Sequence, residues 1–182
     1  MSLKALIVID MQKVSFTPRT VRFDAAGVIK RINALSQQFR QEKYPVVFVQ
    51  HDGSKEGECL PGTEPWELLP ELEIRTSDLI VPKTANDAFY RSDLHRILEE
   101  HGADELVITG CATDFCVDAT VKSALVHDYE VTVVQDGHTT ADRPHGSAEQ
   151  LIAHYNWVWQ HMTPTRGRIR VFPSTAIFSR PN

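Results

Sequence analysis

The chain has 182 residues, 42% of them hydrophobic, which is enough to bury the core of one α/β domain spanning residues 1–182. Its net charge is −5 and its cationic residues are scattered, so nucleic acid is not an expected partner. No apolar run approaches the ~20 residues of a membrane span, which leaves a small molecule as the expected partner.

Six short apolar runs, rich in β-branched residues, predict strands. They are Ala5–Ile9, Val46–Gln50, Leu79–Val81, Leu106–Thr109, Val131–Val134 and Ile169–Phe172. Nearly all are apolar throughout, which is typical of parallel strands buried on both faces. The first run predicts a strand rather than a signal peptide, and the three cysteines do not form a disulfide framework. We therefore expect a cytoplasmic protein.

Helical patterns separate the predicted strands. Apolar residues keep helical spacing in 28–39, 94–98, 117–125 and 151–162. This alternation predicts a three-layer α/β/α fold with a doubly wound, six-stranded parallel sheet. Ligands of such folds bind beyond the carboxyl ends of the strands.

Three reactive side chains follow predicted strands at that edge. Asp10 follows the first strand, Lys83 the third, and Cys116 lies in the first turn of the helix after the fourth. Positive partial charge at a helix N-terminus favours thiolate, so we expect Cys116 to ionise readily. A lysine beside Asp10 would keep that carboxylate charged. The sequence thus predicts a site that uses thiol chemistry.

Two long connections reach the same edge. The segment from His51 to Ser77 is long for its place in the fold and is expected to act as a lid or a subunit contact. The segment from Gln135 to His145 is expected to be a loop. Three histidines at this edge, His51, His138 and His145, are candidates for lining the substrate pocket.

Several short motifs carry a resemblance to a known family. They are Val8-Ile-Asp-Met-Gln12 with Phe16, Pro61-Gly-Thr63, Glu71-Leu72, Lys83 with Asn86 and Phe89, Gly110-Cys-Ala-Thr-Asp-Phe-Cys-Val117, and Asp136. Together they resemble the isochorismatase-like cysteine hydrolases, which include nicotinamidases, N-carbamoylsarcosine amidohydrolase and streptothricin hydrolase. The resemblance covers about residues 4–174.

The resemblance implies roles for individual residues. Asp10, Lys83 and Cys116 would form a catalytic triad. The Cys111–Ala112 peptide bond would be cis, and the N–H groups of Ala112 and Cys116 would form an oxyanion hole. The residues implied or considered as substrate contacts are Gln12, Phe16, Asn86, Phe89 and Phe115. The family's habit also implies a homo-oligomer, either a dimer or a larger assembly such as a tetramer.

The chain departs from the nicotinamidase pattern after the second predicted strand. Nicotinamidases carry an Asp-x-His motif and a further histidine that bind a metal, whereas this stretch reads Phe48-Val-Gln-His-Asp-Gly-Ser54. We therefore expect no metal and no cofactor. The expected activity is hydrolysis of a C–N bond in a small amide, lactam or ureido compound through a thioester. Two alternatives stay open: a thiol-redox protein that uses Cys111 and Cys116, and an isochorismatase-type vinyl ether hydrolase.

Overall fold

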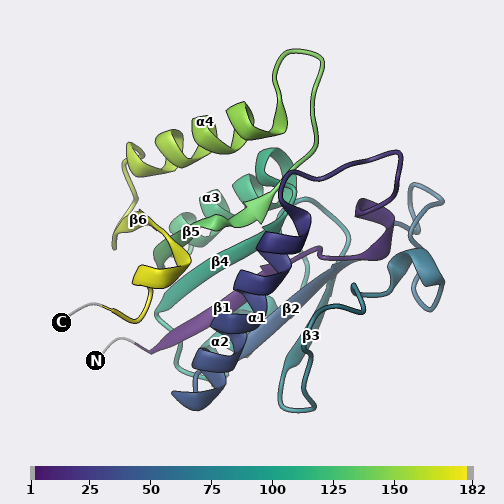
Figure 1. The fold of residues 1–182 in the computed structure, drawn as a ribbon. Coiled ribbons are helices and arrows are strands. Elements are labelled where there is room, and N and C mark those ends of the chain that lie inside the picture. The colour runs from purple at the N-terminus through teal and green to yellow at the C-terminus, as the bar shows by residue number, and fades with distance from the viewer. Residues whose placement is uncertain (1–2, 180–182) are drawn as a thin grey trace.

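The computed structural model describes residues 3–179 and has a six-stranded parallel sheet at its centre (Figure 1). The strands are β1 (Lys4–Ile9), β2 (Val46–His51), β3 (Leu79–Lys83), β4 (Glu105–Cys111), β5 (Glu130–Thr139) and β6 (Ile169–Phe172), in the spatial order β3-β2-β1-β4-β5-β6. The order reverses direction between β1 and β4, which makes this point the topological switch point of the sheet.

The side chains of β1 show how the sheet is buried on both faces. Ala5, Ile7 and Ile9 join one apolar cluster, while Leu6 and Val8 join a second cluster on the opposite face. Each of these side chains has no exposed surface. Successive residues of a strand point to opposite faces, so a run that is apolar at every position requires a cover on each side.

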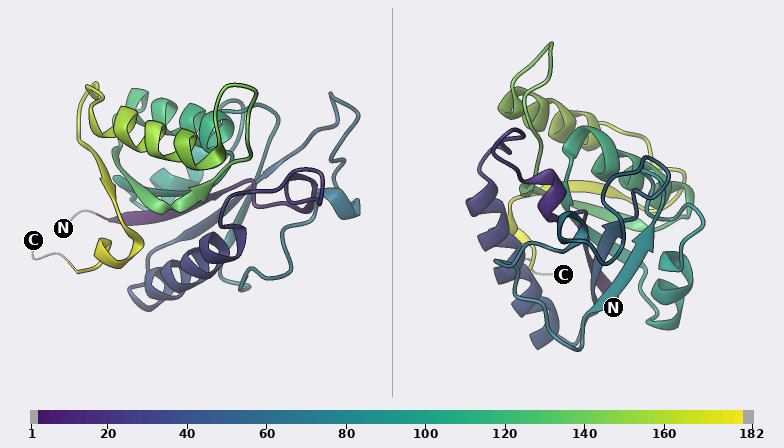
Figure 2. Two further views of the ribbon diagram at one scale, coloured as in Figure 1. Left: turned by 45° about the horizontal axis from the view of Figure 1, so that its top comes forward. Right: turned by 90° about the vertical axis from the view of Figure 1, so that its right-hand side faces the viewer.

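Helices provide both covers, as Figure 2 shows. They are α1 (Ala25–Gln41), α2 (Leu94–Glu100), α3 (Asp118–Val126) and α4 (Ala148–Gln160). Helix α1 packs on the face of Leu6 and Val8, whereas α2, α3 and α4 pack on the opposite face. Helix α4 begins at a capping box formed by Ser147 and Gln150. The expected three-layer fold is confirmed.

Two local expectations are corrected by the structure. Residues Gln135–Thr139 belong to β5 and not to a loop, because the register between β4 and β5 shifts between Ile108 and Gly110 and the longer strand continues beside β4. Cys116 lies in a π-helical turn, Thr113–Val117, that precedes α3, and not in the first turn of an α-helix. Such π-turns are frequent at functional sites.

Within residues 3–179, no helix combines the length and the apolar character needed to cross a bilayer.

Candidate active site

The carboxyl ends of β1 and β3 bring a carboxylate and an ammonium group together. Asp10 follows β1 and is 5% exposed, and Lys83 is the last residue of β3 and is 2% exposed. Nζ of Lys83 lies 2.7 Å from Oδ2 of Asp10. Buried charges of opposite sign satisfy each other only with good geometry, and this distance is that of a charge-assisted hydrogen bond.

The chain after β4 brings the thiol to the same place. The peptide bond between Cys111 and Ala112 is cis, and the π-helical turn follows it directly. Sγ of Cys116 lies 3.5 Å from Nζ of Lys83 and 3.6 Å from Oδ1 of Asn86. Residues from three separate strand ends therefore meet, and Asn86 joins them.

Lys83 makes two further contacts in the site. Its Nζ donates to the carbonyl of Ala85 at 2.8 Å and lies 3.5 Å from Nδ1 of His51, the last residue of β2. Burial, with the charge of Lys83, lowers the pKa of His51, so its ring is neutral at neutral pH. His51 is thus a neutral neighbour of the ammonium group.

Burial dominates the electrostatics of Asp10. It raises the pKa of this carboxyl group, and the charge of Lys83 offsets part of that rise. Oδ1 of Asp10 is buried without a well-aligned hydrogen-bond partner among residues 3–179. The nearby thiol of Cys116 helps to lower the pKa of this carboxyl group. Asp10 is therefore suited to exchange a proton with the thiol.

The expectation that Cys116 ionises readily is wrong for this arrangement. Burial raises the pKa of the thiol, and the nearby carboxylate of Asp10 raises it further, while Lys83 only partly opposes these effects. Sequence position alone suggested a stabilised thiolate, but the loss of solvent outweighs the local dipole. The thiol of Cys116 is therefore neutral at neutral pH and lies near the carboxylate of Asp10.

The other two cysteines lie apart from this centre. Cys111 is 1% exposed and packs in the cluster beneath α1, and burial raises its pKa to about 12. Cys116 packs against the cluster on the other face of the sheet. Cys59 is buried in the long loop, and all three thiols are free. The structure therefore does not present Cys111 and Cys116 as a redox pair.

Two expected substrate contacts have structural roles instead. The amide of Gln12 is 1% exposed, donates to the carbonyls of His51 and Trp66 and accepts from the N–H of His51, so it holds the long loop to the strand ends. Phe89 is 7% exposed and packs in the core against the ring of Tyr129, with centroids 5.8 Å apart. Neither side chain is presented to a substrate.

Phe16 and Phe115 remain candidates at the rim. Phe16 packs partly buried over the cluster beneath α1. Phe115 is 50% exposed, and the guanidinium of Arg143 lies over its ring at 4.9 Å. Of the three histidines expected at this edge, only His51 lies beside Lys83. His138 is buried beneath the turn, and His145 is exposed on the loop before α4.

Sequence reasoning missed how the π-helical turn is held. Arg143 donates to both carboxylate oxygens of Asp114, at 2.7 and 3.1 Å, and Thr140 also donates to Asp114. Burial opposes ionisation of Asp114, but the bonds from Arg143 and Thr140 outweigh it and lower its pKa. The arginine–aspartate pair spans 29 residues of sequence, so no local pattern could have revealed it.

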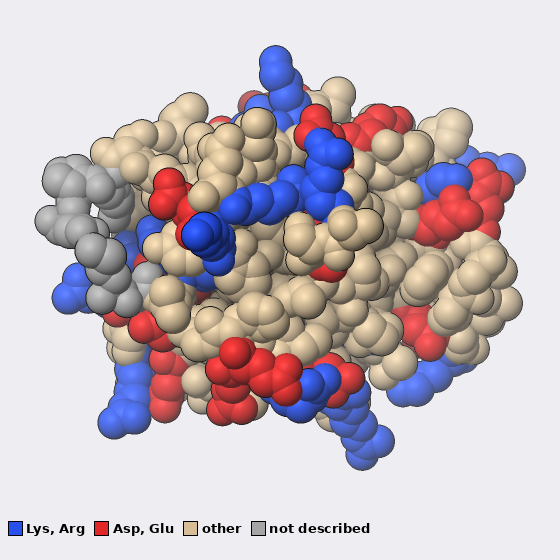
Figure 3. Space-filling model, turned by 90° about the horizontal axis from the view of Figure 1, so that it is seen from below, with Lys and Arg blue, Asp and Glu red and all other residues tan. Residues whose placement is uncertain are grey.

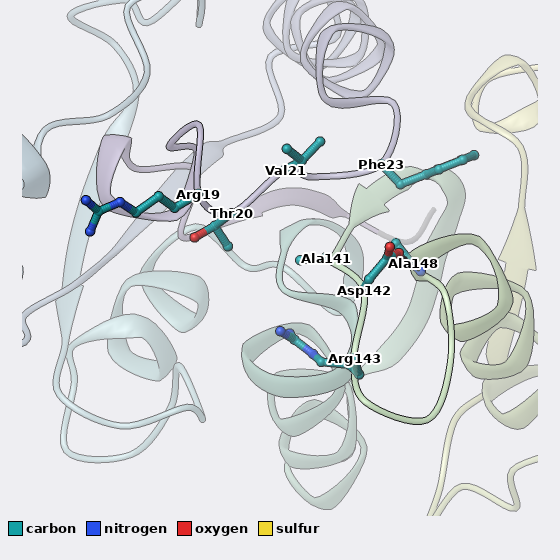
Figure 4. Close-up of a pocket in the computed structure, with 8 residues that line it drawn as sticks. All are labelled: Arg19, Thr20, Val21, Phe23, Ala141, Asp142, Arg143 and Ala148. Atoms are coloured by element: carbon teal, nitrogen blue, oxygen red, sulfur yellow. Dashed lines mark hydrogen bonds between the residues drawn. The ribbon is translucent and has the colours of Figure 1, made fainter.

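A pocket of about 400 Å³ opens beside this arginine. Figure 4 shows it between residues 19–23, which precede α1, and the segment leading into α4. Its lining residues are Arg19, Thr20, Val21, Phe23, Ala141, Asp142, Arg143 and Ala148. The side chains are mixed apolar and charged, and Arg143 links the pocket to the turn that carries Cys116 through its bond to Asp114.

No metal centre accompanies the site within residues 3–179, where histidine, cysteine and acidic side chains form no group of three or more arranged for a metal ion. His51 has Lys83 as its neighbour, and a cation near that nitrogen would meet like charge.

Comparisons with known proteins agree with this geometry. The family model described as "Isochorismatase domain" matches residues 4–163. The chain belongs to the isochorismatase family. It has the α/β/α fold expected from the sequence, which solved structures of this family share.

Relatives of this family member include proteins named as hydrolases. Streptothricin hydrolase of Streptomyces noursei is 32% identical over 141 residues, which cover 78% of this chain and 51% of the relative. Ureidoacrylate amidohydrolase of Variovorax paradoxus is 33% identical over 91 residues, which cover 50% of this chain and 35% of the relative. The chain spans about half the length of the streptothricin hydrolases that it matches.

The fold of this isochorismatase-family chain also matches solved structures. The crystal structure of an isochorismatase family protein superposes with a TM-score of 0.84 at 30% identity, covering 93% of this chain and 98% of the other.

Proposed function

We propose that this isochorismatase-family hydrolase is a metal-independent cysteine amidohydrolase that cleaves a C–N bond of a small amide, lactam or ureido compound. The observation that carries the proposal is the convergence on Lys83, whose Nζ lies 2.7 Å from Asp10 and 3.5 Å from the thiol of Cys116. A nucleophile, a base and a group that orients both are the requirements of covalent acyl transfer. The name of one relative, ureidoacrylate amidohydrolase, supports the same class.

The first half of the reaction forms a thioester. Asp10 takes the proton of the Cys116 thiol as sulfur attacks the carbonyl carbon, and the carbonyl oxygen becomes an oxyanion. The backbone N–H groups of Ala112 and Cys116 are the proposed donors to this oxyanion. Collapse of the intermediate breaks the C–N bond, and Asp10 returns the proton to the departing nitrogen.

The second half releases the acid. Water attacks the thioester carbon while Asp10 takes one of its protons, and the intermediate expels sulfur. Asp10 then returns that proton to Cys116, so the free enzyme regains its neutral thiol. The raised pKa values of Asp10 and Cys116 support this exchange because they keep the proton within the pair. Lys83 keeps Asp10 anionic before each transfer.

The proposed substrate is small and carries little charge. Arg143, the cation beside the nucleophile turn, is already paired with Asp114. On the face shown in Figure 3, cationic and anionic side chains are interspersed, which offers no field of one sign to a polyanion. A small-molecule partner in the cytoplasm remains our proposal.

A substrate panel tests the proposal. Primary amides, cyclic imides and ureido compounds are assayed beside isochorismate for ammonia release or ring opening. We expect turnover of at least one C–N compound, lost in Cys116→Ala, together with a mass increase on Cys116 when turnover is quenched early. Turnover of isochorismate alone, undiminished in Cys116→Ala, would instead support the vinyl ether alternative, in which Asp10 acts as an acid.

A further inference from the structure

A histidine that the proposed chemistry does not use lies beneath the turn that carries Cys116. His138 belongs to β5 and is 1% exposed. Its Nδ1 lies 2.9 Å from Oγ1 of Thr113, and its Nε2 lies 3.0 Å from Oδ1 of Asn156 on α4. The register shift between β4 and β5 pairs His138 with Gly110, which brings the ring under the π-helical turn.

The surrounding bonds assign the ring hydrogen. Asn156 donates from Nδ2 to the carbonyl of Gln135 at 3.0 Å, so its Oδ1 faces His138 as an acceptor. Nε2 of His138 therefore carries the hydrogen, and Nδ1 accepts from the hydroxyl of Thr113. Burial lowers the pKa of His138 to about 4, so the ring is neutral at neutral pH. This tautomer satisfies both ring nitrogens.

Helix α4 also holds the far end of the same turn. The ring of Trp159 packs edge-on against His138, with centroids 5.1 Å apart, and its Nε1 donates to Oδ1 of Asp118 at 3.0 Å. Thr113 is the first residue of the turn, and Asp118 follows its last residue. The backbone that carries Cys116 is thus tied down on both sides of the thiol.

We propose that His138 is a positioning residue that holds Thr113 and thereby aims the Cys116 thiol at Asp10 and Lys83. The proposal rests on the proposed function in taking Cys116 as the nucleophile. Thr113 is completely buried, so its hydroxyl has no solvent to replace the histidine. Misplacing a reacting atom by ~1 Å costs on the order of 10²-fold in rate, so one bond at the base of the turn has a measurable effect on turnover.

Substitution of Thr113 gives the first test. Thr113→Val keeps the shape and removes the hydroxyl, whereas Thr113→Ser keeps the hydroxyl. We expect Thr113→Val to lower kcat by ~10- to 100-fold with little change in KM, and Thr113→Ser to retain most of kcat. All rates are measured well below each variant's melting temperature. A wild-type kcat in Thr113→Val, even with a lower Tm, would show a purely structural role and overturn the proposal.

Substitution of His138 gives a second test that does not depend on Thr113→Val folding. His138→Asn places an amide oxygen near the position of Nδ1 and keeps an acceptor for Thr113. His138→Gln reaches toward Asn156 and loses that acceptor. We expect kcat to survive in His138→Asn and to fall in His138→Gln, although both variants lose the ring contact with Trp159. Equal kcat values in the two variants would contradict the positioning role.

A crystal structure of Thr113→Val tests the positioning role of His138 independently of the proposed function. We expect Sγ of Cys116 to move from its position 3.5 Å from Nζ of Lys83. An unmoved sulfur would overturn the positioning role whatever the substrate is. Undiminished C–N hydrolysis by Cys116→Ala would overturn the proposed function instead and would leave the structural comparison valid.

Discussion

At the scale of single residues, the buried pair of Asp10 and Lys83 decides the chemistry of the site. Removing water from both charges is costly, and their contact at 2.7 Å offsets that cost. The negative charge of Asp10 raises the pKa of Cys116 and so disfavours a free thiolate. In the proposed mechanism the same carboxylate accepts the thiol proton directly. The proposed hydrolysis and simple alkylation of the thiol should therefore respond differently to the loss of this carboxylate.

Replacing Asp10 should therefore move two reactions in opposite directions. In Asp10→Asn, hydrolysis should fall by at least ~10²-fold because no base accepts the thiol proton. Alkylation of Cys116 by iodoacetamide at pH 8 should become faster, because the carboxylate no longer raises the thiol's pKa. Rates come from ammonia release and from peptide mapping, with the exposed Glu42→Gln on the turn after α1 as the control. Slower alkylation with unchanged hydrolysis would identify another base.

The pH dependence of hydrolysis should report Asp10. The carboxylate must be ionised to accept the thiol proton, and burial raises its pKa, so activity should be lost as pH falls through a value above the usual range of aspartate. Lys83 lowers this pKa, so Lys83→Met should move the acid limb of kcat/KM to higher pH. The exposed Lys30→Met should leave the profile unchanged. If the acid limb stays in place in Lys83→Met, the group that produces this limb is not Asp10.

At the scale of elements, the end of β4 depends on an unusual backbone conformation at Gly110. Gly110 has φ of 120°, a value that side chains rarely adopt, and a Cβ built there would lie 2.2 Å from the carbonyl oxygen of Ile9. The close approach of β4 to β1 at the switch point therefore requires glycine. The turn that carries Cys116 begins three residues later, at Thr113.

Gly110→Ala should destabilise the protein and disturb the site together. Strain and the forced separation of β4 from β1 should cost on the order of 3 kcal/mol, which corresponds to a fall in Tm of roughly 6–12 °C for a chain of this size. Gly146→Ala is the matched control, because its Cβ would make only ordinary contacts, the nearest at 3.7 Å. Thermal unfolding followed by circular dichroism measures both. Equal Tm values for the two variants would contradict this account.

At the scale of the whole molecule, the fold places three strand ends at one edge and supplies no ligand cluster for a metal within residues 3–179. Hydrolysis should therefore survive exhaustive chelation, since a first shell needs several oxygen, nitrogen or sulfur ligands. Activity with and without chelator is the measurement, with a zinc hydrolase treated in parallel. Activity that disappears and then returns with zinc, iron or manganese would contradict the prediction.

The proposed homo-oligomer also belongs to this scale. Several large apolar side chains are exposed on the described surface, among them Val126 at 70% and Trp157 at 59%. Light scattering on the purified chain should give the mass of a dimer or tetramer. A monomeric mass across the working concentration range would refute the expectation.

The sequence by itself determined the fold class and the three reactive residues. Strands that are apolar at every position must be covered on both faces, and parallel strands align their carboxyl ends, so Asp10, Lys83 and Cys116 could be predicted to share one edge. These inferences need only local patterns and one general rule of sheet geometry. The structure brings the three side chains together at that edge.

Only the tertiary structure decided the protonation of those residues and the contacts that hold the site in place. Cys116 was expected to be ionised from its place in the sequence, but burial and the carboxylate of Asp10 raise its pKa. Gln12 and Phe89 were expected at the substrate, but backbone bonds and the core occupy them. His138 meets Thr113 across 25 residues through a register shift. Desolvation, burial and register arise from packing between distant segments, and no local pattern in the chain encodes them.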